Sequence, residues 1–184
     1  MKVMSVCVTA CGAMLLLAAC GKVAEKATEK VAEKAIEAQM AKEGVKANVN
    51  LAGSGGTVTT TDASGKTSKL EWGSAQLTEA ELGVPFYPGT QPRQGAATRI
   101  DTPQGQAMTV SLQSGDAADK VAAFYRDKLK AMAEGKQLMD MNMGDGQTTL
   151  MLADKMGGNS TQIHIAKAGA GSEINIVVHR GAAK

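Results

Sequence analysis

At Gly44 the hydrophobic pattern of this 184-residue chain changes from helical spacing to the two-residue alternation of a β-strand. Beyond this glycine, short alternating segments are separated by turns rich in Gly, Asn and Asp. The pattern predicts strands at residues 45–51, 57–61, 67–72, 97–102, 106–113, 137–143, 147–154, 161–167 and 173–180. Because short turns join most neighbouring segments, we expect an antiparallel β-meander.

One long amphipathic segment interrupts the predicted strands. Asp116 is a candidate N-cap for a helix that runs to about Ala133, and five apolar residues share one side of that helix. These residues are Val121, Phe124, Tyr125, Leu129 and Met132. A short helix is expected after Thr78, because Thr78 and Glu81 have the spacing of a capping box. We therefore predict an α+β fold, in which a single helix covers one face of an antiparallel β-meander sheet.

The segment from Lys22 to Glu43 lacks Gly and Pro and is rich in Ala, Glu and Lys, which predicts a helix. Its internal repeat is four residues long, so its apolar positions drift around the helix and form no straight seam. Lys30–Glu33 and Lys34–Glu37 have the spacing of ion pairs within a helix. We expect a long, charged and solvated helical tether in front of the sheet, with pairing to another protein as the alternative.

The first twenty residues have the pattern of a secretory signal, in which Lys2 precedes an uncharged stretch. The stretch ends in Leu17-Ala18-Ala19-Cys20, which resembles the lipobox of bacterial lipoproteins. The resemblance implies cleavage before Cys20, diacylglycerol on its thiol and acylation of the new amino group. Several acyl chains hold a protein on a membrane essentially permanently. Gly21, which is not acidic, implies export to the outer membrane.

Two further motifs resemble a recurrent module of bacterial envelope lipoproteins. They are Val84-Pro85-Phe86-Tyr87-Pro88-Gly89-Thr90, and Val121-Ala122-Ala123-Phe124-Tyr125 followed by Leu129. The similarity spans about residues 83–180, and because the module has no assigned activity it implies only a fold and a location. We expect the aromatic side chains of both motifs to lie in the core. The predicted division of the chain is a signal peptide (1–19), a lipidated N-terminus with the tether (20–43), a β-hairpin extension (44–76) and an α+β domain (77–184).

The composition argues against several classes of function. The net charge is +2 with Lys and Glu interspersed, and there are only five aromatic residues, so we expect no nucleic-acid partner. The two histidines lie on neighbouring predicted strands whose pairing sets His164 opposite Asn175 and His179 opposite Ser160. Such a register keeps the imidazoles from sharing a zinc ion. We predict that the protein is not an enzyme and has no catalytic residue, cofactor or metal site.

Three methionines, Met139, Met141 and Met143, alternate along one predicted strand. Because thioether sulfur binds Cu(I), these residues define the alternative function, a periplasmic small-ligand or Cu(I)-binding protein. Polar residues occupy the intervening positions, however, which favours burial of the methionine face in the core. A two-residue turn at Asp145-Gly146 would place Met141 opposite Leu150 and Met139 opposite Leu152.

These observations together predict a lipid-anchored protein of the cell envelope, at the outer membrane and facing the periplasm. It would carry a non-catalytic structural or interaction module. Its expected partners are the membrane, through acyl chains on Cys20, and a protein of the envelope.

Overall fold

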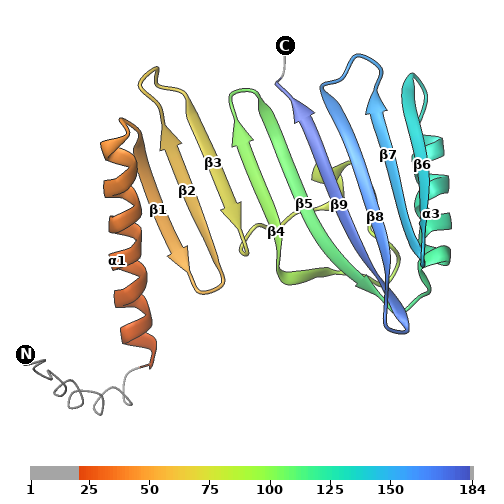
Figure 1. Ribbon diagram of the computed structural model, residues 1–184, viewed down its shortest axis with the longest axis horizontal. Helices are drawn as coiled ribbons and strands as arrows, with labels where there is room; N and C mark the ends of the chain where they lie inside the picture. Colours follow the sequence, from red (N-terminus) through yellow and green to blue (C-terminus); the bar gives the residue numbers. More distant parts are fainter. Residues whose placement is uncertain (1–20, 183–184) are drawn as a thin grey trace, which may run out of the picture.

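The computed structural model describes residues 21–182, with side chains from residue 27 onward. Nine strands form one sheet in the order β1-β2-β3-β4-β5-β9-β8-β7-β6 (Figure 1). The strands are β1 (Lys46–Ala52), β2 (Gly55–Thr61), β3 (Thr67–Trp72), β4 (Pro92–Thr102), β5 (Gly105–Ser114), β6 (Lys136–Gly144), β7 (Gln147–Asp154), β8 (Asn159–Ala168) and β9 (Gly171–Gly181). The helices are α1 (Gly21–Lys42), α2 (Glu79–Leu82) and α3 (Ala118–Ala131).

The expected antiparallel sheet is confirmed, but the class is mainly β, because strands hold 79 residues and helices 40. The α+β prediction gave the helices too much weight. The physical reason lies in β1, β2 and β3, which join the same sheet as the later strands. Leu70 of β3 is paired with Ile100 of β4, so hydrogen bonding continues from the early hairpins into the remainder of the sheet.

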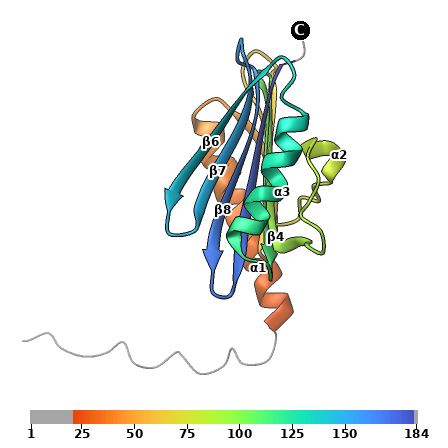
Figure 2. The same ribbon diagram turned by 90° about the vertical axis from the view of Figure 1, so that its right-hand side faces the viewer.

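One face of the sheet is covered by α2 and α3 (Figure 2). The core lies beneath them, because alternate residues of the central strands point to this face and lose almost all contact with solvent. Its fully buried side chains include Val110, Leu112, Tyr125, Leu129, Leu150, Ile163, Ile165, Ile174 and Ile176. The prediction that one long helix packs on the sheet is confirmed. Within residues 21–182 no such helix covers the second face, which is called the open face below.

The aromatic residues of the two motifs contribute to the core, as expected. Tyr87 and Tyr125 are buried, and Phe86 and Phe124 pack against the core while partly exposed. Phe124 makes edge-to-face contacts with both tyrosines, with ring centroids 5.2 Å and 5.1 Å apart. Such contacts add to the free energy gained by burying the rings.

The two predicted helix N-termini differ in outcome. The capping box is confirmed, because the Thr78 hydroxyl accepts from the Glu81 N–H while the Glu81 carboxylate accepts from the Thr78 N–H. The prediction of Asp116 as an N-cap is wrong. The N-cap of α3 is Ala117, which makes no side-chain cap. The Asp116 carboxylate instead accepts from the Tyr87 hydroxyl at 2.7 Å and from the Lys120 ammonium at 3.0 Å.

Helix α1 lies along β1, at the edge of the sheet, rather than standing free as a solvated tether (Figure 1). Three glutamates on one side of it accept hydrogen bonds from backbone N–H groups of β1 and the turn that follows. Glu37 accepts from Val49 at 3.0 Å, Glu33 from Leu51 at 2.8 Å and Glu29 from Gly53 at 2.8 Å. We call these three side chains the glutamate ladder.

The four-residue repeat explains the spacing of this ladder. Four helical residues rise about 6 Å, and two strand residues advance about 6.6 Å, so every fourth glutamate meets every second N–H group. The expected ion pairs are present in the same helix, Lys30–Glu33 at 3.6 Å and Lys34–Glu37 at 2.8 Å. The expectation of a solvated tether rested on the absence of an apolar seam, but α1 docks through polar side chains instead.

Candidate functional site

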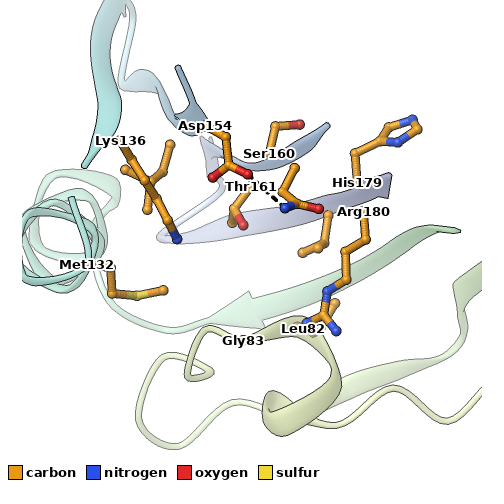
Figure 3. Close-up of a pocket in the computed structure, with 12 residues that line it drawn as sticks. Leu82, Gly83, Met132, Lys136, Asp154, Ser160, Thr161, His179 and Arg180 are labelled. Carbon is orange, nitrogen blue, oxygen red and sulfur yellow. Dashed lines mark hydrogen bonds between the residues drawn. The ribbon is translucent and has the colours of Figure 1, made fainter. Parts of the chain in front are cut away.

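A cavity of about 320 Å³ lies at the end of the sheet where α3 ends and β6 begins (Figure 3). Its apolar side is built from Leu82, Met132, Leu152 and Val178. These residues come from α2, the end of α3 and two strands, so the cavity exists only when the helices are packed on the sheet. Its volume is at the lower end of the range typical of small-molecule sites.

Charged and polar groups line the remainder of the cavity. The Asp154 carboxylate accepts from the Asn159 amide at 2.7 Å, and the Arg180 guanidinium donates to the Glu81 carbonyl. The Lys136 side chain extends toward the cavity (Figure 3), and within residues 27–182 its ammonium makes no hydrogen bond or salt bridge. Two cations and one carboxylate beside an apolar wall would suit a small acid with an apolar portion.

This cavity has no signature in the sequence. Its lining comes from six separate segments, each contributing one to three residues, and none of them forms a motif. The sequence holds only an indirect indication of the cavity, which is that three charged residues lie at or next to strand ends. These residues are Lys136, Asp154 and Arg180. Which strand ends meet depends on the order of strands in the sheet. A β-meander would place β6 beside β5, but β9 lies there instead, because α3 carries the chain from β5 to the far edge.

The two histidines lie where the register predicted them. His164 is opposite Asn175 and His179 is opposite Ser160, and the pairs Ile163–Ile176 and Ile165–Ile174 confirm the full alignment of β8 and β9. The His179 ring points away from the cavity (Figure 3). Across the described part of the chain, no three side chains of His, Cys, Asp or Glu are grouped so that they could hold a metal ion.

The prediction that the methionine face is buried in the core is wrong. Met139, Met141 and Met143 are 36%, 47% and 67% exposed, and they lie on the open face. Met141 is opposite Thr149 instead of Leu150, and Met139 is opposite Met151 instead of Leu152.

A β-bulge causes this difference. Gly144 does pair with Gln147 as expected, but Asn142 then pairs with Thr148, so Met143 is an extra residue in β6. The Asn142 side chain accepts from the Gly144 N–H at 2.9 Å, and Gly144 has a φ of 80°. Because side chains alternate along a strand, one extra residue moves every residue that precedes it in β6 to the opposite face from the one expected.

Asp140 therefore points to the face that α3 covers, where a carboxylate was not expected. It forms a two-pronged salt bridge with Arg126 of α3, one of whose bonds measures 3.2 Å. The guanidinium of Arg126 lowers the pKa of this carboxyl group. The charged partner on α3 makes this position compatible with an aspartate. For this reason the presence of Asp140 did not identify the solvent-facing side of β6.

Cys20, the proposed lipidation site, lies outside the described residues. In the described part of the chain, no helix is both long enough and apolar enough to cross a membrane. Comparison of the chain with family models, with curated proteins and with solved structures found no match.

Proposed function

We propose that this chain is a lipid-anchored protein of the bacterial envelope whose sheet serves as a non-catalytic structural or interaction module. Its N-terminus would be acylated at Cys20, and the body would face the periplasm from the outer membrane. The observation that carries the proposal is the glutamate ladder. It fixes the helix that directly follows Cys20 to the edge of the sheet.

Because the glutamate ladder fixes α1 to the sheet, a lipid anchor at Cys20 would also set the orientation of the sheet relative to the membrane. Glu29 is bonded at Gly53, in the turn between β1 and β2, and α1 continues from there to Gly21. Eight helical residues span about 12 Å. An acylated Cys20 would thus hold that end of the sheet near the membrane surface, and β9 ends on the opposite side of the sheet (Figure 1).

The open face supplies a surface for a protein partner. Val58, Leu70 and Ile100 stand in one row across β2, β3 and β4, and Ile100 is 40% exposed. A row of aliphatic side chains on an uncovered sheet suits an apolar partner surface. We propose that an envelope protein with such a surface binds there.

The anchor is tested by mass spectrometry of the N-terminal peptide from membrane-extracted protein. We expect a peptide that starts at Cys20 and carries acyl chains, and Cys20→Ser should abolish the modification. An unmodified peptide starting at any other residue would refute the lipoprotein assignment.

The interaction surface is tested by placing a photo-crosslinking amino acid at position 100 in the native envelope. The matched control places it at Lys128, on the solvent side of α3. A discrete crosslinked protein from position 100 alone supports the proposal. Equal crosslinking from both positions, or none from position 100, contradicts it.

The cavity beside Lys136 supports a second candidate function, the binding of a small acid with an apolar portion. Lys136 would hold the acid group while Met132 and Leu152 contact the apolar part. Anilinonaphthalene sulfonate, an aromatic sulfonate, is a suitable fluorescent probe. We expect Lys136→Glu to weaken its binding and Lys128→Glu to leave it unchanged; equal binding by both variants would exclude this use of the cavity.

A further inference from the structure

We propose that Met141, Met143 and His164 form a binding site for a soft monovalent metal ion, Cu(I) or its analogue Ag(I), on the open face of the sheet. The site goes beyond the proposed interaction function and depends on neither the acyl anchor nor a protein partner. It also differs from the sequence-based alternative, because it includes a histidine from another strand.

The three side chains converge because of the register. Met141 of β6, Thr149 of β7 and His164 of β8 are directly opposite one another, so they form a row across three strands. Side chains opposite one another on neighbouring strands have their Cβ atoms about 5 Å apart. The bulge adds Met143 to this row instead of leaving it one step further along β6.

Thr149 marks the centre of the site. Its hydroxyl oxygen lies 3.0 Å from His164 Nδ1 and 3.9 Å from Met143 Sδ. His164 Nδ1 and Met143 Sδ are therefore at most about 7 Å apart. Thr149 is only 5% exposed although it points to the open face, which is consistent with neighbouring side chains closing over it.

To hold a metal ion, the two sulfur atoms must approach His164 Nε2, because Nδ1 is bonded to Thr149. Two ligands with metal bonds of slightly over 2 Å stand about 4 Å apart across the ion. A methionine has three rotatable bonds, so Met143 and the half-exposed Met141 can turn their sulfur atoms toward Nε2 without moving the backbone. The exposure of both residues also gives an ion direct access from solvent.

Thr149 acts as the positioning residue in this site. With Nδ1–H donating to the Thr149 hydroxyl, and that hydroxyl directed at Met143 Sδ, the lone pair of His164 Nε2 is free for the metal. A second ring nitrogen that donates to an oxygen is the usual support for a metal-binding histidine. Two thioethers and one neutral imidazole form a soft, uncharged ligand set, which favours Cu(I) over Zn²⁺ or Ca²⁺.

The experiment uses the full chain with Cys7, Cys11 and Cys20 replaced by serine, because free thiols would bind Cu(I) themselves. Competition against a chromophoric Cu(I) chelator and calorimetric titration with Ag(I) measure affinity and stoichiometry. We expect one ion per chain with a dissociation constant below about 1 µM. Zn²⁺ should not compete. Since the acylation site is removed, the result is independent of the lipid-anchor proposal.

Variants of the ligands identify the site. Met143→Leu and His164→Gln should each weaken binding by at least about tenfold. The matched control is Met156→Leu, in a turn where the side chain is 99% exposed, and it should bind as the parent protein does. Circular dichroism checks that each variant is folded. Binding weaker than about 10 µM in the parent, or equal losses in Met143→Leu and Met156→Leu, would refute the site.

Thr149 provides a separate test of positioning. Thr149→Val keeps the shape but removes the hydroxyl, and should weaken Ag(I) binding while leaving the stoichiometry at one. Thr149→Ser restores the hydroxyl and should recover the affinity. The signals of the Met141 and Met143 methyl groups should shift on Ag(I) addition, and an unchanged pair of signals would contradict the proposed ligands.

Discussion

The two halves of the sheet are stabilised by different means. Strands β4 to β9 carry the core, whose apolar side chains are buried under α2 and α3. Strands β1 to β3 contribute no residue to that core, and the outermost of them is bonded to the glutamate ladder of α1. One continuous sheet thus combines a half that depends on apolar burial with a half that depends on backbone pairing and charged side chains.

The difference shows that alternation alone does not reveal what holds a strand. Strand β1 alternates in burial as the central strands do, but the helix beside it bonds to the N–H groups of its edge. An uncovered edge strand presents free N–H groups to any other chain, and the ladder occupies those of Val49 and Leu51. The glutamate repeat therefore protects the sheet as well as stabilising it.

The largest expected effect comes from the β4–β9 half. Leu150 is fully buried beneath α3, so Leu150→Ala should lower the free energy of unfolding by about 2–5 kcal/mol. Leu70→Ala is the matched change in the β1–β3 half and should cost much less, because Leu70 stays partly exposed. Urea denaturation measures both. Equal losses would show that the two halves have equivalent cores.

Removing the glutamate ladder should have the next largest effect. In the triple variant Glu29→Ala, Glu33→Ala and Glu37→Ala, the N–H groups of Val49, Leu51 and Gly53 lose their acceptors. Hydrogen exchange should accelerate at these amides, and the bare edge should promote self-association in sedimentation experiments. The control replaces Gln39 and Lys42, two exposed residues of the same helix, with alanine. Unchanged exchange in the glutamate variant would show that α1 does not protect β1.

A smaller effect should follow acidification. The hydrogen bond from Lys34, and then that from the Val49 N–H, hold the pKa of Glu37 below its ordinary 4.5. Because the pKa is lower in the docked state, this carboxylate's contribution is complete above pH 4.5 and is lost as the pH falls through the lowered value. The Val49 amide signal in NMR should titrate with a midpoint below 4.5, and Glu37→Gln should abolish that titration. A midpoint at or above 4.5 would contradict the docked helix.

The smallest change is expected from Met141→Ala. Met141 is 47% exposed on β6, the edge strand of the half that carries the core. Its truncation leaves no cavity, so the free energy of unfolding should fall by less than about 1 kcal/mol. A loss as large as that of Leu150→Ala would show that the methionine face is covered in solution.

The sequence was a sound guide to features formed by residues near one another in the chain. Alternation and turn residues predicted the hairpin of β2 and β3, and the register of β8 and β9 followed from a single short turn. The capping box at Thr78 is local in the same sense. The N-cap prediction at Asp116 failed because its carboxylate is directed at Tyr87, which lies 29 residues earlier.

The candidate sites could not be predicted from residues that are near one another in the chain. A single bulged residue, Met143, reversed the expected face of β6, since the faces of a strand alternate with every residue. Asn142 and Gly144 were the signal that could have revealed the bulge, through a side-chain bond and a positive φ. The ligand set of the proposed metal site additionally requires His164, which only strand pairing brings near Met143.

The sequence by itself determined where the strands, turns and helices form, because those choices depend on side-chain period, turn residues and caps within a few positions. Tertiary structure alone decided which face is covered, where α1 docks and which strand ends enclose the cavity. The glutamates of α1 find their partners only once β1 has become the edge of the sheet. The exposure of a residue and its bonding partners depend on segments that are far away in the chain. The packing of the whole sheet therefore decides how much each residue contributes to stability.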